Sequence, residues 1–535
     1  MNKELMLELN DKIENSLTKI KRQYLIEDGN IPWLIGYSGG KDSTCTAQLV
    51  YRALLELKKD SKELKRQVYI FSSDTMIENP LVKLRVDENL NLIKLNATAL
   101  ELPIEAIILK PEIEKTFWVN VIGRGYPTPN TMFRWCTDRL KIEPANNFVH
   151  KCIDKNGEVI MVLGVREGES NTRDRTLKKH EIEGELLMKH TSLSNAYVFP
   201  PIKDFTTKDI FAYLLTQPSP WKSNNKELYA FYEESGGGDC PIFVSEEEKS
   251  SSNACGNSRM GCWACTVVSK DKSLTGFIET GTYDFLKPLL EFRNWLSVVR
   301  DDDNYRCRYR NNGSVYTKKI NKKITETGEF LVAPKKGDKD KVTIEIKNDG
   351  TLVDSNGIEY IKIGLNELSQ YMKENNLNFK SPELARIIMV DHITNEYYKL
   401  GVGPFTDEAK QEIFEKLIET EYLYNQNSEN KIQLITDKEI IEIKKMWVKS
   451  AIDVNFIDSV LNKYGRGKIE LIRDSFEIVN SRYEIKLKKK LKEKKLEFDV
   501  VNKLLIKEKD LLAKENRKEI QHYISLIFNS DKINY

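Results

Sequence analysis

Short apolar runs alternate with amphipathic stretches in the first half of the chain. Runs typical of buried strands occur at 31–37, 67–73, 104–110, 159–165 and 197–202. Between the first two, the segment TCTAQLVYRALLELKK spaces its apolar residues by three and four, which predicts a helix. Apolar strands that alternate with helices predict an α/β fold with a doubly wound, mostly parallel sheet.

The pattern changes along the chain and indicates three regions. Residues 1–30 predict an N-terminal helix. Residues 31–300 hold the predicted sheet and, at 235–270, an insert rich in glycine, serine and cysteine. Residues 301–535 predict a largely helical C-terminal region.

The C-terminal region is not uniform in its pattern. Residues 315–362 contain possible strands and turns, and from about residue 364 the pattern is nearly all helical. The stretch from Tyr483 to Ile520 is so highly charged that it predicts a solvated helix.

Composition bears on the cellular compartment of the protein but does not decide whether it binds a nucleic acid. The chain has 83 basic and 81 acidic residues, a balance that neither requires nor excludes a nucleic acid. It contains no apolar run near the ~20 residues that a membrane helix needs, and its N-terminus has no apolar signal core. We therefore expect a cytoplasmic protein with no membrane partner.

The first predicted strand runs directly into a loop rich in glycine and hydroxyl groups. Its residues are Ser38, Gly39, Gly40, Lys41, Asp42, Ser43 and Thr44. Two glycines let backbone N–H groups approach an anion, the following helix N-terminus adds partial positive charge, and Lys41 adds a full charge. This is not a Walker A loop, because Asp42 follows the Gly-Lys pair and Ile35 replaces the first glycine.

Polar residues also follow two other predicted strands. Asp74 follows the second strand, and Gly164, Arg166, Glu169 and Arg173 follow the fourth. Ligands of open α/β sheets collect at the carboxyl ends of strands, and a guanidinium can bind phosphate through two hydrogen bonds. We expect these residues to lie beside the phosphate loop.

The eight cysteines are unevenly placed, and none follows Cys307. Cys255, Cys262 and Cys265 lie within eleven residues in a glycine-rich segment, so their thiolates can surround a metal centre. Cys240 and Cys136 compete for the fourth position, and the number of thiols does not separate zinc from iron–sulfur. The remaining cysteines are expected in the core: Cys45, Cys152 and Cys307.

The phosphate loop resembles that of the PP-loop ATP pyrophosphatases, which have an adenine nucleotide α-hydrolase-like fold. The elements Asp74-Thr75 and Gly164-Val165-Arg166-Glu167-Gly168-Glu169-Ser170 are similar to those of the PAPS-reductase branch. The resemblance implies ATP with Mg²⁺ and cleavage between its α- and β-phosphates. It implies nucleotide contacts from Ser38, Gly39, Gly40, Lys41, Asp42, Ser43, Thr44, Asp74, Gly164, Arg166, Glu169 and Arg173.

A second resemblance bears on the metal. The segment FRWCTDRLKIEP around Cys136 is similar, with one residue inserted, to the stretch of assimilatory APS reductases whose cysteine ligates a [4Fe–4S] cluster. This favours iron–sulfur over zinc. The implied ligands are four of the five residues Cys136, Cys240, Cys255, Cys262 and Cys265.

The segments SGGKDST, FRWCTDRLK, GVREGES, CGNSRMGCWACTVV and GPFT together resemble the DndC family of DNA phosphorothioation proteins. The resemblance implies ATP-dependent sulfur transfer to the DNA backbone, with a cysteine desulfurase as sulfur donor and companion proteins of a phosphorothioation complex. A DNA phosphate oxygen would be adenylated, and sulfur would then displace AMP. The candidate catalytic residues are Lys41, Asp42, Arg166 and Cys136.

Three alternatives stay open at this stage. A tRNA thiolase also combines a PP-loop with a cluster. A sulfonucleotide reductase of unusual length is another, although plain reductases keep a reactive cysteine near the C-terminus and this chain has none after Cys307. The third is a non-catalytic scaffold that binds the nucleotide and the cluster without turnover.

Overall fold

The computed structural model describes most of the chain. The described residues are 3–26, 31–168, 175, 186–191, 193–236, 261–311, 313–326, 328–332, 343–450 and 452–470. Several sequence predictions lie outside these ranges: those for Glu169, Arg173, Cys240, Cys255 and the charged stretch from Tyr483.

The backbone divides into two compact units, each described by itself below. Unit 1 comprises Met1–Phe117, Pro129–Trp295 and Leu423–Leu434. Unit 2 comprises Trp118–Thr128, Leu296–Tyr422 and the chain from Ile435 onward.

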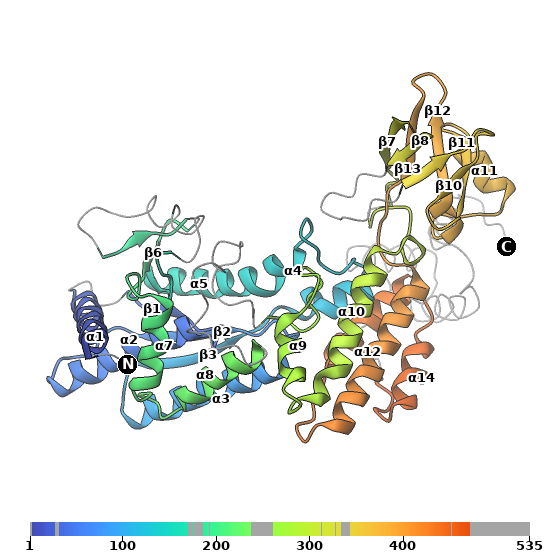
Figure 1. The fold of residues 1–535 in the computed structure, drawn as a ribbon. Coiled ribbons are helices and arrows are strands. Elements are labelled where there is room, and N and C mark those ends of the chain that lie inside the picture. The colour runs from blue at the N-terminus through green and yellow to red at the C-terminus, as the bar shows by residue number, and fades with distance from the viewer. Residues whose placement is uncertain are drawn as a thin grey trace, which may run out of the picture. The chain divides into compact units, whose positions relative to one another are not determined.

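A six-stranded sheet with the order β3-β2-β1-β4-β6-β5 forms the centre of unit 1 (Figure 1). Its strands are β1 (Trp33–Gly36), β2 (Val68–Ser73), β3 (Ile104–Leu109), β4 (Val159–Val162), β5 (Met188–Lys189) and β6 (Ala196–Phe199). All neighbouring strands are parallel except β5 and β6. The five strands predicted from apolar runs are confirmed as β1 to β4 and β6. The short strand β5 was not predicted.

Helices cover both faces of this sheet. Helix α5 (Glu143–Asn156) packs its Val149 and Cys152 against strand residues such as Leu34. Right-handed crossovers place α2 (Lys41–Lys59) and α3 (Pro80–Ala99) on the opposite face. The strand order therefore reverses between β1 and β4, and the doubly wound parallel sheet is confirmed.

The other helices of unit 1 extend the layers around the sheet. Helix α1 lies where an N-terminal helix was expected, and its Tyr24 donates a hydrogen bond from its hydroxyl to the carbonyl of Arg66 (2.8 Å). The Arg66 guanidinium donates back to the Tyr24 carbonyl (2.8 Å), which fixes α1 to the loop before β2. The bounds are α1 (Lys3–Leu25), η1 (Ile113–Lys115), α4 (Trp135–Thr137), η3 (Asp138–Ile142), α7 (Thr207–Thr216), α8 (Asn225–Ser235), α9 (Lys272–Glu279), η4 (Asp284–Leu286) and α10 (Lys287–Asp301). Helix α10 belongs to unit 1 up to Trp295 and to unit 2 from Leu296.

Unit 2 contains a closed barrel with the strand order β10-β11-β12-β13-β7-β8-β9 (Figure 1). Its strands are β7 (Thr317–Thr325), β8 (Gly328–Val332), β9 (Thr343–Ile346), β10 (Leu352–Asp354), β11 (Glu359–Gly364), β12 (Ile387–Asp391) and β13 (Glu396–Leu400). Ile320, Leu331 and Ile388 belong to the cluster of buried side chains at its core. Closure leaves a barrel without free edge strands.

Helices accompany the barrel in unit 2. They are η2 (Val119–Gly123), η5 (Asp303–Tyr305), α11 (Leu368–Glu374), η6 (Pro382–Arg386), α12 (Asp407–Asn427), α13 (Asp437–Lys449) and α14 (Asn455–Lys463). The last turn of α12, from Leu423, belongs to unit 1. The expectation that the chain is nearly all helical from residue 364 is wrong for β12 and β13, which form a hairpin. Their β-branched and aromatic residues flank a turn in which Asn395 has φ +55°, and this favours strands over a helix.

The segment Gly403-Pro404-Phe405-Thr406 makes backbone hydrogen bonds within unit 2. The N–H of Cys307 donates to the Pro404 carbonyl (2.9 Å), and the N–H of Phe405 donates to the Gly125 carbonyl (2.6 Å). A Cβ at Gly403 would coincide with the carbonyl of Tyr309. This segment thus joins two other stretches of chain, at Gly125 and at residues 307–309, through its backbone. In the described part of the chain, no helix is both long and apolar enough to cross a bilayer.

Candidate functional site

The predicted phosphate loop connects β1 to α2 and depends on both of its glycines. Gly39 has φ +71°, and a Cβ at this position would lie 2.5 Å from Cγ2 of Val86. Gly40 is the N-cap of α2 with an extended backbone, and a Cβ there would lie 3.2 Å from the hydroxyl of Tyr232. Gly39 is needed for the turn, and Gly40 permits a close approach.

Hydroxyl groups tie the loop to the first turn of α2. The Ser38 N–H donates to Oγ of Ser43 (3.2 Å), and Ser43 Oγ donates to the Gly40 carbonyl (3.0 Å). Ser38 Oγ also lies 3.1 Å from Ser43 Oγ. Thr44 is only 3% exposed and is part of the buried base of the loop. The serines therefore hold the loop in its shape in this structure, and the nucleotide contacts of Ser38, Ser43 and Thr44 stay a prediction.

Asp42 lies between two cations at the start of α2. Its Oδ2 accepts from Nζ of Lys41 (2.9 Å), and its Oδ1 accepts from Nε of Arg166 (2.6 Å). Arg166 is 3% exposed and also donates to the Phe205 carbonyl (3.3 Å). The carboxylate thus orients both cations beside the loop, which makes Asp42 a positioning residue in this arrangement.

Lys41 keeps its charge in this setting. Burial by itself lowers the pKa of the Lys41 ammonium, but Tyr232 and Asp42 outweigh it, so its pKa lies above the ordinary value. A group with a raised pKa contributes stability below its unfolded-state pKa, and the contribution is lost only as the pH rises through the folded-state value. Lys41 is therefore an ammonium throughout the neutral range.

The segment after β4 meets the loop at the point where the strand order reverses. β1 and β4 are neighbouring parallel strands, so their carboxyl ends lie side by side. A Cβ at Gly164 would lie 2.9 Å from the carbonyl of Asp42, so only glycine lets the two segments approach this closely. Open α/β sheets bind their ligands at such a reversal. The structure thus confirms that Gly164 and Arg166 lie beside the loop.

Asp74 lies at the end of β2 but is already paired. Its side chain accepts from Nζ of Lys83 (3.0 Å) and from the N–H of Met76 (2.8 Å), and Nζ of Lys110 lies 3.7 Å away. It is 7% exposed. Asp74 fixes the turn that follows β2 in this structure.

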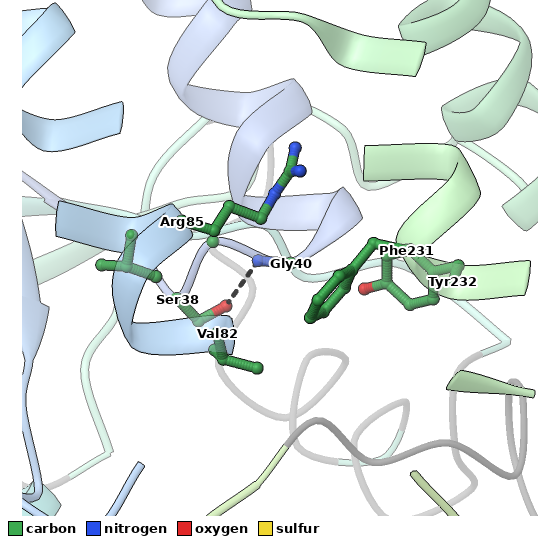
Figure 2. A pocket seen from close by; sticks show the side chains of 8 residues that line it. Ser38, Gly40, Val82, Arg85, Phe231 and Tyr232 are labelled. Atoms are coloured by element: carbon green, nitrogen blue, oxygen red, sulfur yellow. Dashed lines mark hydrogen bonds between the residues drawn. The ribbon is translucent and has the colours of Figure 1, made fainter. Parts of the chain in front are cut away.

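A cavity of about 150 Å³ opens at the phosphate loop (Figure 2). It is lined by Ser38, Gly39, Gly40, Val82, Arg85, Val86, Phe231 and Tyr232. The Lys41 N–H, the first of α2, donates to the Tyr232 hydroxyl (3.1 Å). The cavity has room for a small anion, and Ser38, Arg85 and Tyr232 place polar groups in a lining that is otherwise apolar.

Three of the candidate metal ligands, Cys136, Cys262 and Cys265, lie close enough to affect the pKa values of their shared neighbours. Burial raises the pKa of the Cys136 thiol, and neighbouring Cys265 raises it further. Cys262 raises the pKa of Lys141 more than any other neighbour does, and Glu78, Cys136 and Cys265 add to the effect. Burial raises the pKa of Cys262 itself to about 12. Within the described ranges, no three histidine, cysteine or acidic side chains have the geometry of a metal site.

The CxxC segment is held beside the end of β2. The N–H of Trp263 donates to the carbonyl of Ile77 (3.0 Å), and Thr75 Oγ1 lies 3.4 Å from Sγ of Cys262. From α10, the fully buried Arg293 donates to the carbonyls of Cys265 and Ser269 (both 2.9 Å) and to that of Val268. Cys45, Cys152 and Cys307 are buried, as expected for core cysteines.

Sequence reasoning missed three residues of this region. Arg85 and Tyr232 line the cavity, and Arg293 holds the CxxC loop. None belongs to a recognisable motif. The only signal for Arg85 is its place on the helix that follows Asp74, whereas Tyr232 and Arg293 reach the site through tertiary folding alone.

Comparison with known proteins supports the class of this domain. Residues 32–268 match the family model of the phosphoadenosine phosphosulfate reductase domain. This part of the chain is thus a PAPS-reductase-like, nucleotide-utilising domain of the PP-loop class. The match covers the phosphate loop, the segment after β4 and the CxxC segment.

Individual relatives are distant. An uncharacterized protein of Methanocaldococcus jannaschii is 24% identical over 209 residues, which is 39% of this chain and 35% of that protein. The chain thus spans about a third of the length of this curated relative.

The solved structures that the comparison found share still less sequence with this chain. A phosphoadenylyl-sulfate reductase from Candida auris is 14% identical with a TM-score of 0.26, covering 43% of this chain and 93% of that one. The U34-tRNA thiolase NcsA from Methanococcus maripaludis, solved with its [4Fe–4S] cluster, is 14% identical with a TM-score of 0.24, covering 42% of this chain and 74% of that one. An FMN adenylyltransferase from Candida glabrata is 13% identical with a TM-score of 0.24, covering 39% of this chain and 59% of that one.

Proposed function

We propose that this protein is an ATP-dependent sulfurtransferase that places sulfur in the DNA backbone as a phosphorothioate. The observation that carries the proposal is the pairing of two sites in unit 1. A phosphate loop with the ion network of Lys41, Asp42 and Arg166 lies at the strand reversal, and a group of thiols lies at the end of β2 next to it in the sheet. Activation of an oxygen by ATP and delivery of sulfur need these two kinds of site.

In the first step, the loop binds the β- and γ-phosphates of ATP with Mg²⁺. A non-bridging DNA phosphate oxygen attacks the α-phosphorus, the bond to the β-phosphate oxygen breaks, and pyrophosphate leaves. Lys41, oriented by Asp42, stabilises the charge that develops on the phosphoryl oxygens. Arg166 reinforces the same electropositive end of the sheet.

In the second step, a nucleophilic sulfur attacks the DNA phosphorus and AMP leaves with the activated oxygen. If the sulfur arrives as a persulfide made by a cysteine desulfurase, a second thiol then attacks the carrier sulfur and the S–S bond breaks, which leaves the outer sulfur on the DNA phosphorus. The two thiols remain as a disulfide, which an external thiol reductant reduces before the next turnover. Companion proteins of a phosphorothioation complex would present the DNA. AMP is a far better leaving group than oxide, which is the reason to consume ATP.

We further propose a [4Fe–4S] cluster at the thiol group. Cys136, Cys262 and Cys265 would provide three ligands, and the fourth would come from Cys240 or Cys255. The soft thiolate donors suit such a cluster, and Lys141 offsets their negative charge. When bound, the cluster would supply a site that holds sulfide or transfers electrons.

The test is mass spectrometry of nuclease-digested DNA from cells with and without this chain in its native gene context. We expect phosphorothioate dinucleotides that disappear on deletion and fail to return with Lys41→Ala or Cys262→Ser. Purified Lys41→Ala should release pyrophosphate roughly 10²–10³-fold more slowly. Cys152→Ser, in the core of the sheet and away from the thiol group, is the matched control and should restore the modification.

Other outcomes would identify a different substrate. Thionucleosides lost from tRNA with DNA unmodified would indicate a tRNA thiolase, and sulfite released from APS or PAPS would indicate a sulfonucleotide reductase. Nucleotide binding without any pyrophosphate release would indicate a scaffold. Each of these results contradicts the DNA proposal.

A further inference from the structure

Helix α3 brings one cation to the cavity at the phosphate loop. Val82, Arg85 and Val86 line the cavity from α3, and Phe231 and Tyr232 line it from α8. In the view of Figure 2, Gly40 lies between Arg85 and the two aromatic residues. Arg85 thus belongs to the same small space as the glycines of the loop.

Among the described residues, the Arg85 guanidinium has a ring contact but no acceptor. It makes no hydrogen bond or ion pair with any residue that the structure describes, and its guanidinium carbon lies 6.0 Å from the centre of the Phe231 ring. Burial lowers its pKa, although Tyr37, Glu227, Tyr232 and Glu88 counteract this effect from a distance. An arginine still carries its charge at neutral pH.

A neighbouring cation on the same helix shows the contrast. Lys83 is paired with both Asp74 and Asp87 at 3.0 Å. Desolvating a charge costs free energy unless an opposite charge or hydrogen bonds compensate. Arg85 carries this cost without a described acceptor, at the edge of a cavity large enough for an anion.

The Tyr232 hydroxyl is hydrogen-bonded to the first N–H of α2 at the loop. It accepts the N–H of Lys41, and the first N–H groups of a helix are the usual donors to a bound phosphate. Nζ of Lys41 lies 5.7 Å from the centre of the Tyr232 ring. The ring itself packs edge-on against Phe211, with 5.5 Å between their centroids. The hydroxyl is thus held against the loop from α8.

We infer that Arg85 and Tyr232 complete a pyrophosphate-binding site at this loop: Arg85 binds the anion from α3, and the Tyr232 hydroxyl gives up the Lys41 N–H to a phosphate oxygen. The inference rests on the proposed use of ATP and identifies two further residues of that site. In the structure the Tyr232 hydroxyl accepts the Lys41 N–H, and an oxygen of a bound polyphosphate would replace this hydroxyl.

Calorimetric titration of the full-length protein with inorganic pyrophosphate and with ATP tests this inference. Arg85→Gln should weaken pyrophosphate binding roughly tenfold to a hundredfold, because a charge-assisted contact is lost. Arg85→Lys should recover part of the affinity, since a point charge replaces the planar fork. Lys94→Gln removes the same charge from an exposed position of α3 and should leave the affinity unchanged.

Tyr232→Phe gives an independent measurement. With the competing phenol removed, pyrophosphate should bind about twofold to tenfold more tightly, the range of one ordinary hydrogen bond. Weaker binding by this variant would mean that the hydroxyl donates to the anion. That result would overturn the inference that a phosphate oxygen replaces the hydroxyl at the Lys41 N–H.

The outcomes separate this inference from the proposed function. If the wild-type protein binds neither pyrophosphate nor ATP, both fail. If the wild-type protein binds them and Arg85→Gln binds equally well, only the role of Arg85 is wrong. If Arg85→Gln does not fold, the comparison of Arg85→Lys with Lys94→Gln decides, and equal affinities of these two variants would overturn the inference.

Discussion

At the scale of single residues, the phosphate loop shows how a short motif depends on its surroundings. Gly39 and Gly40 satisfy different needs: a left-handed turn against Val86 for the first and an approach to Tyr232 for the second. Asp42, which the sequence suggested as a catalytic residue, holds two cations in place. The chemistry of the loop therefore depends on residues from α3, α8 and the segment after β4.

The first prediction concerns Gly39. Gly39→Ala should abolish nucleotide binding and destabilise unit 1, because the new Cβ combines a left-handed φ with a 2.5 Å contact to Val86. The control is Gly157→Ala at the end of α5, where φ is +82° and a Cβ meets nothing within 4 Å. Both variants should lose about 1–2 kcal/mol to backbone strain.

Only Gly39→Ala should also lose pyrophosphate affinity, as measured by calorimetry alongside thermal unfolding. Equal affinity in the two variants would mean that the loop does not bind the phosphates.

At the scale of elements, the site is assembled from strand ends and from the helix that supports them. The carboxyl ends of β1 and β4 adjoin, which brings the loop to Arg166, and the CxxC segment lies beside the turn after β2. Helix α10 contributes Arg293, which holds the carbonyls of three residues in and after the CxxC segment. A buried arginine used in this way fixes a loop that has little regular structure of its own.

The second prediction concerns this support. Arg293→Gln should lower the iron retained by the purified protein and destabilise it, because three partly buried carbonyls lose their donor at about 1 kcal/mol each. Lys287→Gln on the same helix is the control, since its side chain is 52% exposed and pairs only with Asp284 among the described residues.

Iron content per chain and thermal unfolding are the measurements. Pyrophosphate affinity should stay the same in both variants, because the phosphate loop lies on another part of the sheet. Full iron content in Arg293→Gln would contradict the supporting role.

At the scale of the whole molecule, the chain has two compact units with separate cores. Unit 1 is built on the parallel sheet, and unit 2 contains a closed barrel with its own buried cluster. The nucleotide and thiol sites both lie in unit 1. In unit 2, the segment from Gly403 to Thr406 forms backbone contacts that hold separate stretches together.

The third prediction tests this division. Gly403→Ala should destabilise unit 2 severely, because a Cβ has no space beside the Tyr309 carbonyl and the backbone must move. Gly357→Ala, where φ is +78° and a Cβ meets nothing within 4 Å, is the milder control.

Calorimetry should show a lowered transition for unit 2 while pyrophosphate binding by unit 1 persists. A single transition that falls together with the loss of pyrophosphate binding would show that the two units fold as one.

The sequence by itself predicted much of the local structure of unit 1 and the position of the phosphate loop. Buried parallel strands are continuous apolar runs, so β1 to β4 and β6 were predictable, and the glycine-rich loop was recognisable because strand, turn and helix start are adjacent in the chain. The strands of β12 and β13 were missed, since a short hairpin between helical patterns gives a weak signal.

Only the tertiary structure decided which distant side chains meet. Three side chains reach the sites from separate helices: Arg85, Tyr232 and Arg293. The sequence patterns of these helices indicate which face is buried but not which site a side chain contacts. The pairing of acidic side chains was also decided by the tertiary structure: Asp74 accepts a hydrogen bond from Lys83, and Asp42 accepts one from Arg166. Periodicity records which face of an element is buried, whereas a site depends on distances between elements, and these are fixed only when the chain packs.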